Sequence, residues 1–141
     1  MPRLENIKRS GKENKFEITS QSKINSSVID ELIFSQMKEA VLGADYELSL
    51  VIIGKKEIRN LNKSYRGIDK FTDILSFPLS ASEGEIFICL EVARKEAPNF
   101  NRSYDNFIKF LFIHGLVHLK GFEHSDKMEA EEKITRSKFK V

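Results

Sequence analysis

All three histidines of the chain lie within eleven residues, in the run HGLVHLKGFEH from His114 to His124. His114 and His118 are four residues apart, so on a helix both imidazoles lie on one face, about one turn apart, within reach of one ion. Gly121 can adopt the left-handed conformation that ends a helix, which would turn the chain back and bring His124 to the same point. Three neutral imidazoles with a fourth position open to water are typical of a catalytic zinc site. The sequence therefore predicts one Zn²⁺ per chain, held by His114, His118 and His124.

Two other interpretations of these histidines stay open. His114 follows Phe107 and Leu111 on an apolar stripe, and a single histidine in such a place is usually a core residue with one hydrogen bond. The spacing H-x3-H-x2-G-x2-H also occurs in metzincin proteases, in which a glutamate after the first histidine acts as general base. Here that position is Gly115, which cannot accept a proton. The sequence therefore favours metal-assisted ester or phosphoryl chemistry, with a metalloprotease as the alternative.

Basic residues are distributed unevenly, although the net charge of +2 is too small to identify a partner. Residues 1–15 hold five Lys/Arg against two acids, residues 55–70 hold six against two, and residues 127–141 hold five against three. In the middle stretch Arg59, Lys63 and Arg66 share one face of a short predicted helix, where they are candidates for binding nucleic-acid phosphates. The guanidinium of Arg66 can bond two phosphate oxygens at once, but an ordinary salt bridge with Asp69 explains it equally well.

Hydrophobic periodicity predicts four strands and four helices in one domain over residues 1–141, and residues 1–14 can form a flexible basic arm. The order is β, α, β, α, β, β, α, α, which indicates an α+β or α/β layer with a small mixed sheet. The predicted strands are Phe16–Ile24, Tyr46–Ile53 (buried on both faces), Ile74–Phe77 (stopped by Pro78) and Glu85–Leu90. The first helix is capped by Ser26 or Ser27, buries Val28, Leu32, Ile33, Met37 and Val41, and ends at Gly43. The second has Ile58, Leu61 and Tyr65 on one face and ends at Gly67. The other two helices are Asn106–Lys120 and Asp126–Phe139.

The single cysteine, Cys89, excludes an internal disulfide, and its apolar neighbours predict a core residue in a reducing cytosol. No run of the sequence approaches the roughly 18 apolar residues of a membrane helix, and the first residues contain no apolar signal core. We therefore expect a soluble cytoplasmic protein that does not bind a membrane.

Three segments together resemble the YbeY family of bacterial endoribonucleases: HGLVHLKGFEH, LNKSYRGIDKFTDILSFP at 61–78 and GEIFI at 84–88. The resemblance spans roughly residues 45–135. This chain departs from the usual family residues at Val117 (leucine), Glu85 and Glu123 (aspartate) and Phe71 (proline), none of which is a predicted metal ligand.

The resemblance implies a fold and a function. The fold is α+β, a mixed sheet of four strands packed with helices, one of them a metal-binding helix like that of zinc proteases. The function is a metal-dependent endoribonuclease, specific for single strands, that acts in maturation of the 3′ end of small-subunit ribosomal RNA and in ribosome quality control. The arginine of the YRG motif, Arg66, is a functional residue in that family. Implied partners are single-stranded RNA, a ribosomal RNA precursor, the ribosome or its small-subunit proteins, and a ribosome-associated GTPase. A ribosome-binding assembly factor with a structural zinc stays an alternative.

Overall fold

The computed structural model describes residues 15–121 and 126–141, so the predicted basic arm and His124 lie outside the described residues. The elements follow the order β1 (Phe16–Ser20), α1 (Glu31–Leu42), β2 (Glu47–Ile52), α2 (Lys55–Arg66), β3 (Ile74–Ser80), β4 (Glu83–Ile88), α3 (Leu90–Glu96), the 3₁₀ helix η1 (Ala97–Phe100), α4 (Tyr104–Leu119) and α5 (Asp126–Phe139). Both late helices and all four strands occur where the sequence predicts them, with shifted ends for several.

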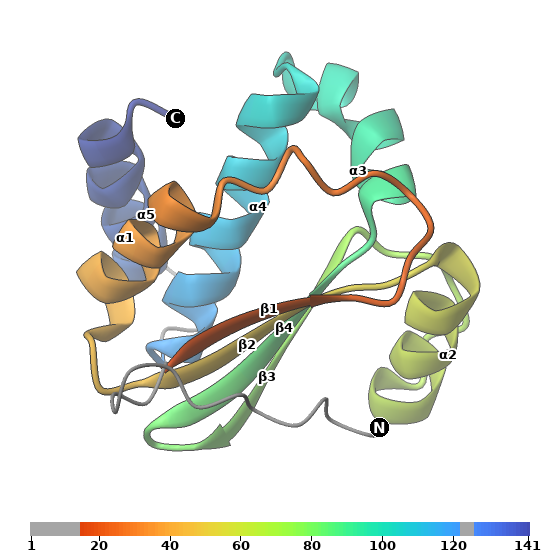
Figure 1. Ribbon diagram of the computed structural model, residues 1–141, viewed down its shortest axis with the longest axis horizontal. Helices are drawn as coiled ribbons and strands as arrows, with labels where there is room; N and C mark the ends of the chain where they lie inside the picture. Colours follow the sequence, from red (N-terminus) through yellow and green to blue (C-terminus); the bar gives the residue numbers. More distant parts are fainter. Residues whose placement is uncertain (1–14, 122–125) are drawn as a thin grey trace.

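The four strands form one mixed sheet in the order β1-β2-β4-β3. β2 pairs in parallel with β1 and with β4, whereas β3 runs antiparallel to β4 at the edge. Helices α1, α4 and α5 lie on one side of this sheet and α2 lies on the other (Figure 1). The α+β fold with a small mixed sheet is thereby confirmed.

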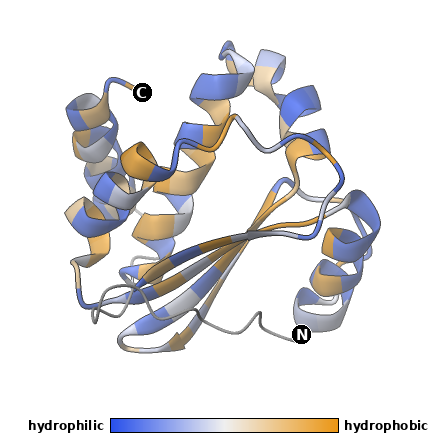
Figure 2. Ribbon diagram, viewed as in Figure 1, coloured by the Kyte–Doolittle hydropathy of each residue, from blue (hydrophilic) through white to orange (hydrophobic). Residues whose placement is uncertain are grey.

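Strand β2 is buried on both faces, as its continuous apolar run predicts. Leu50 and Ile52 pack with Phe112 in the core under α1 and α4, while Val51 packs with Ile58 in a smaller cluster under α2. Figure 2 shows the corresponding difference between the helices, because α4 is largely hydrophobic and α2 is mostly hydrophilic. The sheet therefore separates a large core around α4 from a thin layer that supports a polar helix.

The start of α1 differs from the prediction. Asp30 caps the helix instead of Ser26 or Ser27, and its carboxylate accepts a hydrogen bond from the Ile33 N–H at 3.2 Å. A turn precedes it, closed by the Ile29 N–H on the Ser26 carbonyl at 2.9 Å. Because the helix begins three or four residues later, its buried positions become Phe34, Met37, Lys38 and Val41, and Leu32 is 69% exposed. The predicted cap and the predicted burial of Leu32 were wrong.

Strand β3 continues through Pro78 to Ser80, so the predicted stop at Pro78 was wrong. The reason is the place of β3 at the edge of the sheet, where a residue without an N–H is tolerated and the register shifts between Pro78 and Ser80. Strand β1 ends at Ser20 and not at Ile24, which is exposed. Tyr65 on α2, which the helical pattern places on one face with Ile58 and Leu61, is also exposed.

The segment between β4 and α4 was not predicted. Leu90 begins α3 and does not end a strand, because Cys89 takes the N-cap position and the Ala93 N–H bonds the Cys89 carbonyl at 3.0 Å. Cys89 is fully buried, which confirms the expected core residue, and burial raises the pKa of its thiol. Within residues 15–121 and 126–141, none of the helices has the length and apolar composition needed to cross a membrane.

Candidate active site

The paired histidines lie on α4, which is the longest helix of the described chain. Ser103 caps the helix by accepting a hydrogen bond from the Asn106 N–H at 3.1 Å. One turn separates His114 from His118, and their ring centroids lie 4.7 Å apart with the planes nearly perpendicular, at 82°. Both side chains are half-buried. The structure therefore brings two of the three predicted ligands together on one face of the helix.

The third predicted ligand, His124, lies outside the described residues. In the part of the chain that the structure describes, no three His, Cys, Asp or Glu side chains are grouped so that they could hold a metal ion. The zinc site with three histidines therefore stays a prediction.

Glu132 of α5 is a site residue that sequence reasoning missed. It is buried, and its Oε1 lies 2.7 Å from Nδ1 of His114. A carboxylate on Nδ1 holds the imidazole in one orientation and favours the tautomer whose Nε2 is free of a proton. The available signal was the position of Glu132 on the buried face of α5, between Met128 and Thr135. A charged residue on a buried helix face needs a partner, and the sequence did not show which one.

Asp73 is a second carboxylate near His114, and it directly precedes β3. Burial raises its pKa and the charge of Glu96 adds to that rise, whereas backbone hydrogen bonds and His114 oppose it. Its main-chain carbonyl accepts the Cys89 N–H at 2.9 Å, which ties the start of β3 to the end of β4. Asp73 is half-buried, and a carboxyl group in such a place with a raised pKa is suited to proton transfer.

Gly115 explains how closely α4 approaches the sheet. A Cβ atom there would lie 3.0 Å from Cδ1 of Ile86 and 3.0 Å from Oγ of Ser76. Position 115 thus faces the sheet, and a glutamate would collide with β3 and β4. This geometry weighs against the metalloprotease interpretation independently of the missing base.

The basic face of α2 is exposed, and one of its members is already paired. Nε of Arg59 lies 2.8 Å from Oδ1 of Asp69, and this hydrogen bond lowers the pKa of Asp69. The salt bridge that was an alternative for Arg66 is therefore made by Arg59. Lys63 and Arg66 lie in the last turn, before Gly67, which ends the helix in the left-handed conformation at φ 70°.

Arg66 is not brought next to the histidine pair by any interaction seen in the described residues. Arg66 is the last residue of α2 and Lys55 is the first, so the two residues lie about 16 Å apart along the helix axis. Among residues 15–121 and 126–141, no side chain forms a hydrogen bond or an ion pair with Arg66. The roles predicted for Arg66, Arg59 and Lys63 stay predictions.

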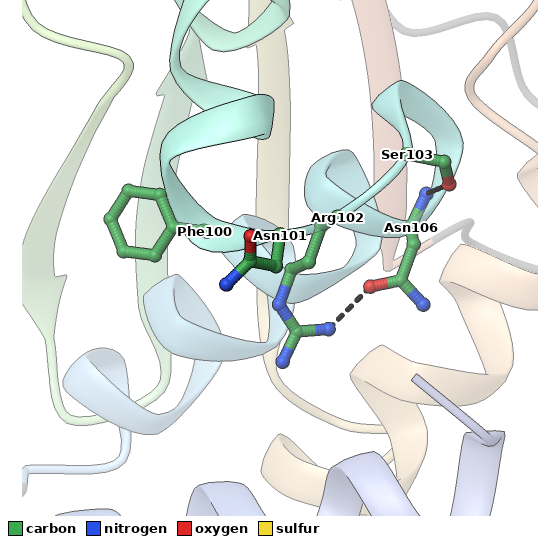
Figure 3. A pocket seen from close by; sticks show the side chains of 5 residues that line it. All are labelled: Phe100, Asn101, Arg102, Ser103 and Asn106. Atoms are coloured by element: carbon green, nitrogen blue, oxygen red, sulfur yellow. Dashed lines mark hydrogen bonds between the residues drawn. The ribbon is translucent and has the colours of Figure 1, made fainter.

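Two hollows adjoin α4. The first, of about 570 Å³, opens between α4 and α5 and exposes His114; it is lined by Phe110, His114, Asp126, Glu129, Ala130, Glu132, Lys133 and Arg136. The second lies at the start of α4, about 12 Å along the helix from His114, and Figure 3 shows its lining residues, with Arg102 hydrogen-bonded to Asn106. Of these two hollows, the first is lined by His114, and neither is lined by His118.

Comparison with known proteins gives consistent matches. The solution structure of the protein TM1509 from Thermotoga maritima has a TM-score of 0.64 and 25% sequence identity, covering 89% of this chain and 91% of that chain. The family model described as endoribonuclease YbeY matches residues 7–140. The endoribonuclease YbeY of Staphylococcus carnosus is 34% identical, over 78% of this chain and 80% of the relative, and that of Staphylococcus aureus is 34% identical, over 77% and 79%.

These matches and the paired histidines define a hydrolytic enzyme of the endoribonuclease class. The chain belongs to the endoribonuclease YbeY family, which confirms the resemblance carried by its sequence motifs.

Proposed function

We propose that this enzyme is a metal-dependent endoribonuclease that cuts single-stranded segments of the small-subunit ribosomal RNA precursor, in maturation of its 3′ end and in ribosome quality control. Membership of the endoribonuclease YbeY family supports the reaction class. The observation that carries the site assignment is the 2.7 Å contact between Glu132 and Nδ1 of His114, beside the ring of His118. A buried carboxylate in this place is the usual companion of a metal-binding histidine.

The residues that would hold the metal are His114, His118 and His124, with one Zn²⁺ per chain. The donor set fits, because imidazole nitrogens suit zinc and the contact of Glu132 with Nδ1 favours the His114 tautomer whose Nε2 carries no proton. When bound, such an ion supplies a positive charge that polarises a phosphodiester.

The surrounding side chains have separate tasks in this proposal. Glu132 orients His114, and Asp73, whose carboxyl pKa is raised by burial, is placed to take part in proton transfer during cleavage. Arg59 and Lys63 bind phosphates of the strand, and Arg66 stabilises the negative charge that develops on the phosphate under attack. Binding partners in the cytoplasm would be the ribosome or its small-subunit proteins, and a ribosome-associated GTPase.

The test combines metal analysis with cleavage of a small-subunit ribosomal RNA precursor by the native enzyme and by His118→Ala. We expect one zinc per native chain and metal-dependent cleavage, and we expect loss of both in the variant. Glu131→Gln is the matched control, because Glu131 bonds Lys120 at the surface and does not contact a histidine. Purified protein that binds ribosomes but never cuts RNA would favour the assembly factor, and digestion of casein at stoichiometric zinc would favour the protease.

A further inference from the structure

Phe71, in the loop between α2 and β3, is a large apolar side chain that the fold leaves 45% exposed. Two cations of α2 lie over its ring, Nζ of Lys55 at 4.4 Å and Cζ of Arg59 at 5.2 Å from the centroid. Because Lys55 and Arg59 are four residues apart on one face of the helix, both approach the ring from the side of α2. The rest of the ring is open to solvent.

The loop that carries Phe71 is tied to α2 on both sides of residue 69. Asn62 is buried, and its side-chain Nδ2 donates to the main-chain carbonyl of Lys70 at 3.1 Å. The main-chain carbonyl of Asn62 accepts a hydrogen bond from the Ile68 N–H at 3.3 Å. Between these two contacts Asp69 bonds Arg59 at 2.8 Å. The ring is therefore positioned before any ligand arrives, and a ligand would meet a small entropy cost there.

The charge around this ring favours a polyanion as the occupant. Helix α2 carries five Lys/Arg (Lys55, Lys56, Arg59, Lys63 and Arg66) against one acid, Glu57. Single-stranded nucleic acids bind where cations follow the phosphates and aromatic rings stack on the bases. The combination at Phe71 thus fits single-stranded RNA.

Phe71 also lies close to the candidate active site along the chain. Only Thr72 separates it from Asp73, so the Cα atoms of Phe71 and Asp73 are at most about 7 Å apart. Asp73 in turn lies within electrostatic range of His114. A strand with one nucleotide on Phe71 would therefore pass close to Asp73, next to the start of β3.

We propose that Phe71 is a base-stacking residue: the exposed face of its ring receives one unpaired base of the RNA strand, and the adjoining phosphates lie along the cations of α2. This inference rests on the proposed function and names a binding subsite for the same substrate.

The test uses the absence of tryptophan from the sequence. Phe71→Trp places a single fluorophore at the subsite, and stacking on a base quenches indole emission. Phe100→Trp is the matched control. Phe100 is exposed to a similar extent, at 48%, but the nearby cation Arg102 lies over the ring of Phe110, at 4.2 Å from its centroid, and not over the ring of Phe100. Figure 3 shows the Phe100 ring directed away from Arg102. Each variant is titrated with a dye-labelled single-stranded oligoribonucleotide, and anisotropy of the dye reports binding independently of the tryptophan.

We expect emission from Phe71→Trp to fall with the same midpoint as the anisotropy rises, while Phe100→Trp stays bright. The same strand annealed to its complement should not quench Phe71→Trp, because its bases are already paired. Phe71→Ala should bind single strands roughly five- to 150-fold more weakly, and Phe71→Trp should retain affinity.

Three results would overturn the inference while leaving the proposed function intact: bound RNA without quenching of Phe71→Trp, equal quenching at both positions, or native affinity in Phe71→Ala. Failure of the native protein to bind single-stranded RNA at all would overturn the proposed function together with this subsite.

Discussion

Replacing Glu132 by glutamine tests whether His114 is oriented for a metal. The substitution preserves the size of the side chain and removes its charge, so it leaves no cavity in the packing of α5 on α4. The carboxylate lies 2.7 Å from Nδ1 of His114, and its side chain is only 9% exposed, so water cannot readily replace it. Loss of such a partner typically weakens metal binding 10- to 100-fold, which corresponds to about 1.4–2.7 kcal/mol. Because glutamine can still accept a hydrogen bond, we expect zinc to bind roughly tenfold more weakly to Glu132→Gln than to the native protein. The loss of zinc affinity should be larger for Glu132→Ala.

The assay is competition for zinc with a chromophoric chelator, together with thermal melting of the metal-free proteins. Glu131→Gln is the control, because the neighbouring carboxylate bonds Nζ of Lys120 at 2.8 Å on the surface. Its zinc affinity should equal that of the native protein. Our reasoning about Glu132 would be refuted by native zinc affinity in Glu132→Gln, or by a loss that the melting of the metal-free variant accounts for entirely.

Three further predictions address the core, the buried lysine and the basic helix. Gly115→Ala should lower the free energy of unfolding by about 1–3 kcal/mol in urea titrations, because the added Cβ lies 3.0 Å from Ile86 and Ser76; an unchanged midpoint would contradict the tight packing. Burial lowers the pKa of Lys38 below its value of 10.5 in the unfolded chain, so the unfolded state binds the proton more tightly. The native protein should therefore gain stability relative to Lys38→Met as the pH rises toward 10.5, by at most about 1.4 kcal/mol per pH unit, and a difference independent of pH would refute this. Arg66→Ala should slow single-turnover RNA cleavage about a hundred- to thousandfold without changing the melting temperature or zinc content, and a loss of affinity alone would make Arg66 a binding residue.

Several elements could be predicted because their causes are local. The continuous apolar run of β2 indicates burial on both faces, and the structure shows cores on both sides of that strand. Gly67 ends α2 because the helix end requires a positive φ, which glycine adopts without strain. The errors arose where the environment decides. Pro78 remains in a strand because β3 is at the edge of the sheet, and position in the sheet cannot be read from a strand's own residues.

The candidate site divides in the same way. Sequence alone determined that His114 and His118 share one face of a helix, since a spacing of four residues has that result in any helix. Only the tertiary structure decided which carboxylates surround them. Glu132 reaches His114 because α5 packs on α4, and Asp73 lies within electrostatic range of the same histidine because Gly115 allows α4 to lie close against β3. These contacts depend on packing between elements far apart in the chain, and local residue patterns carry no record of which elements will meet.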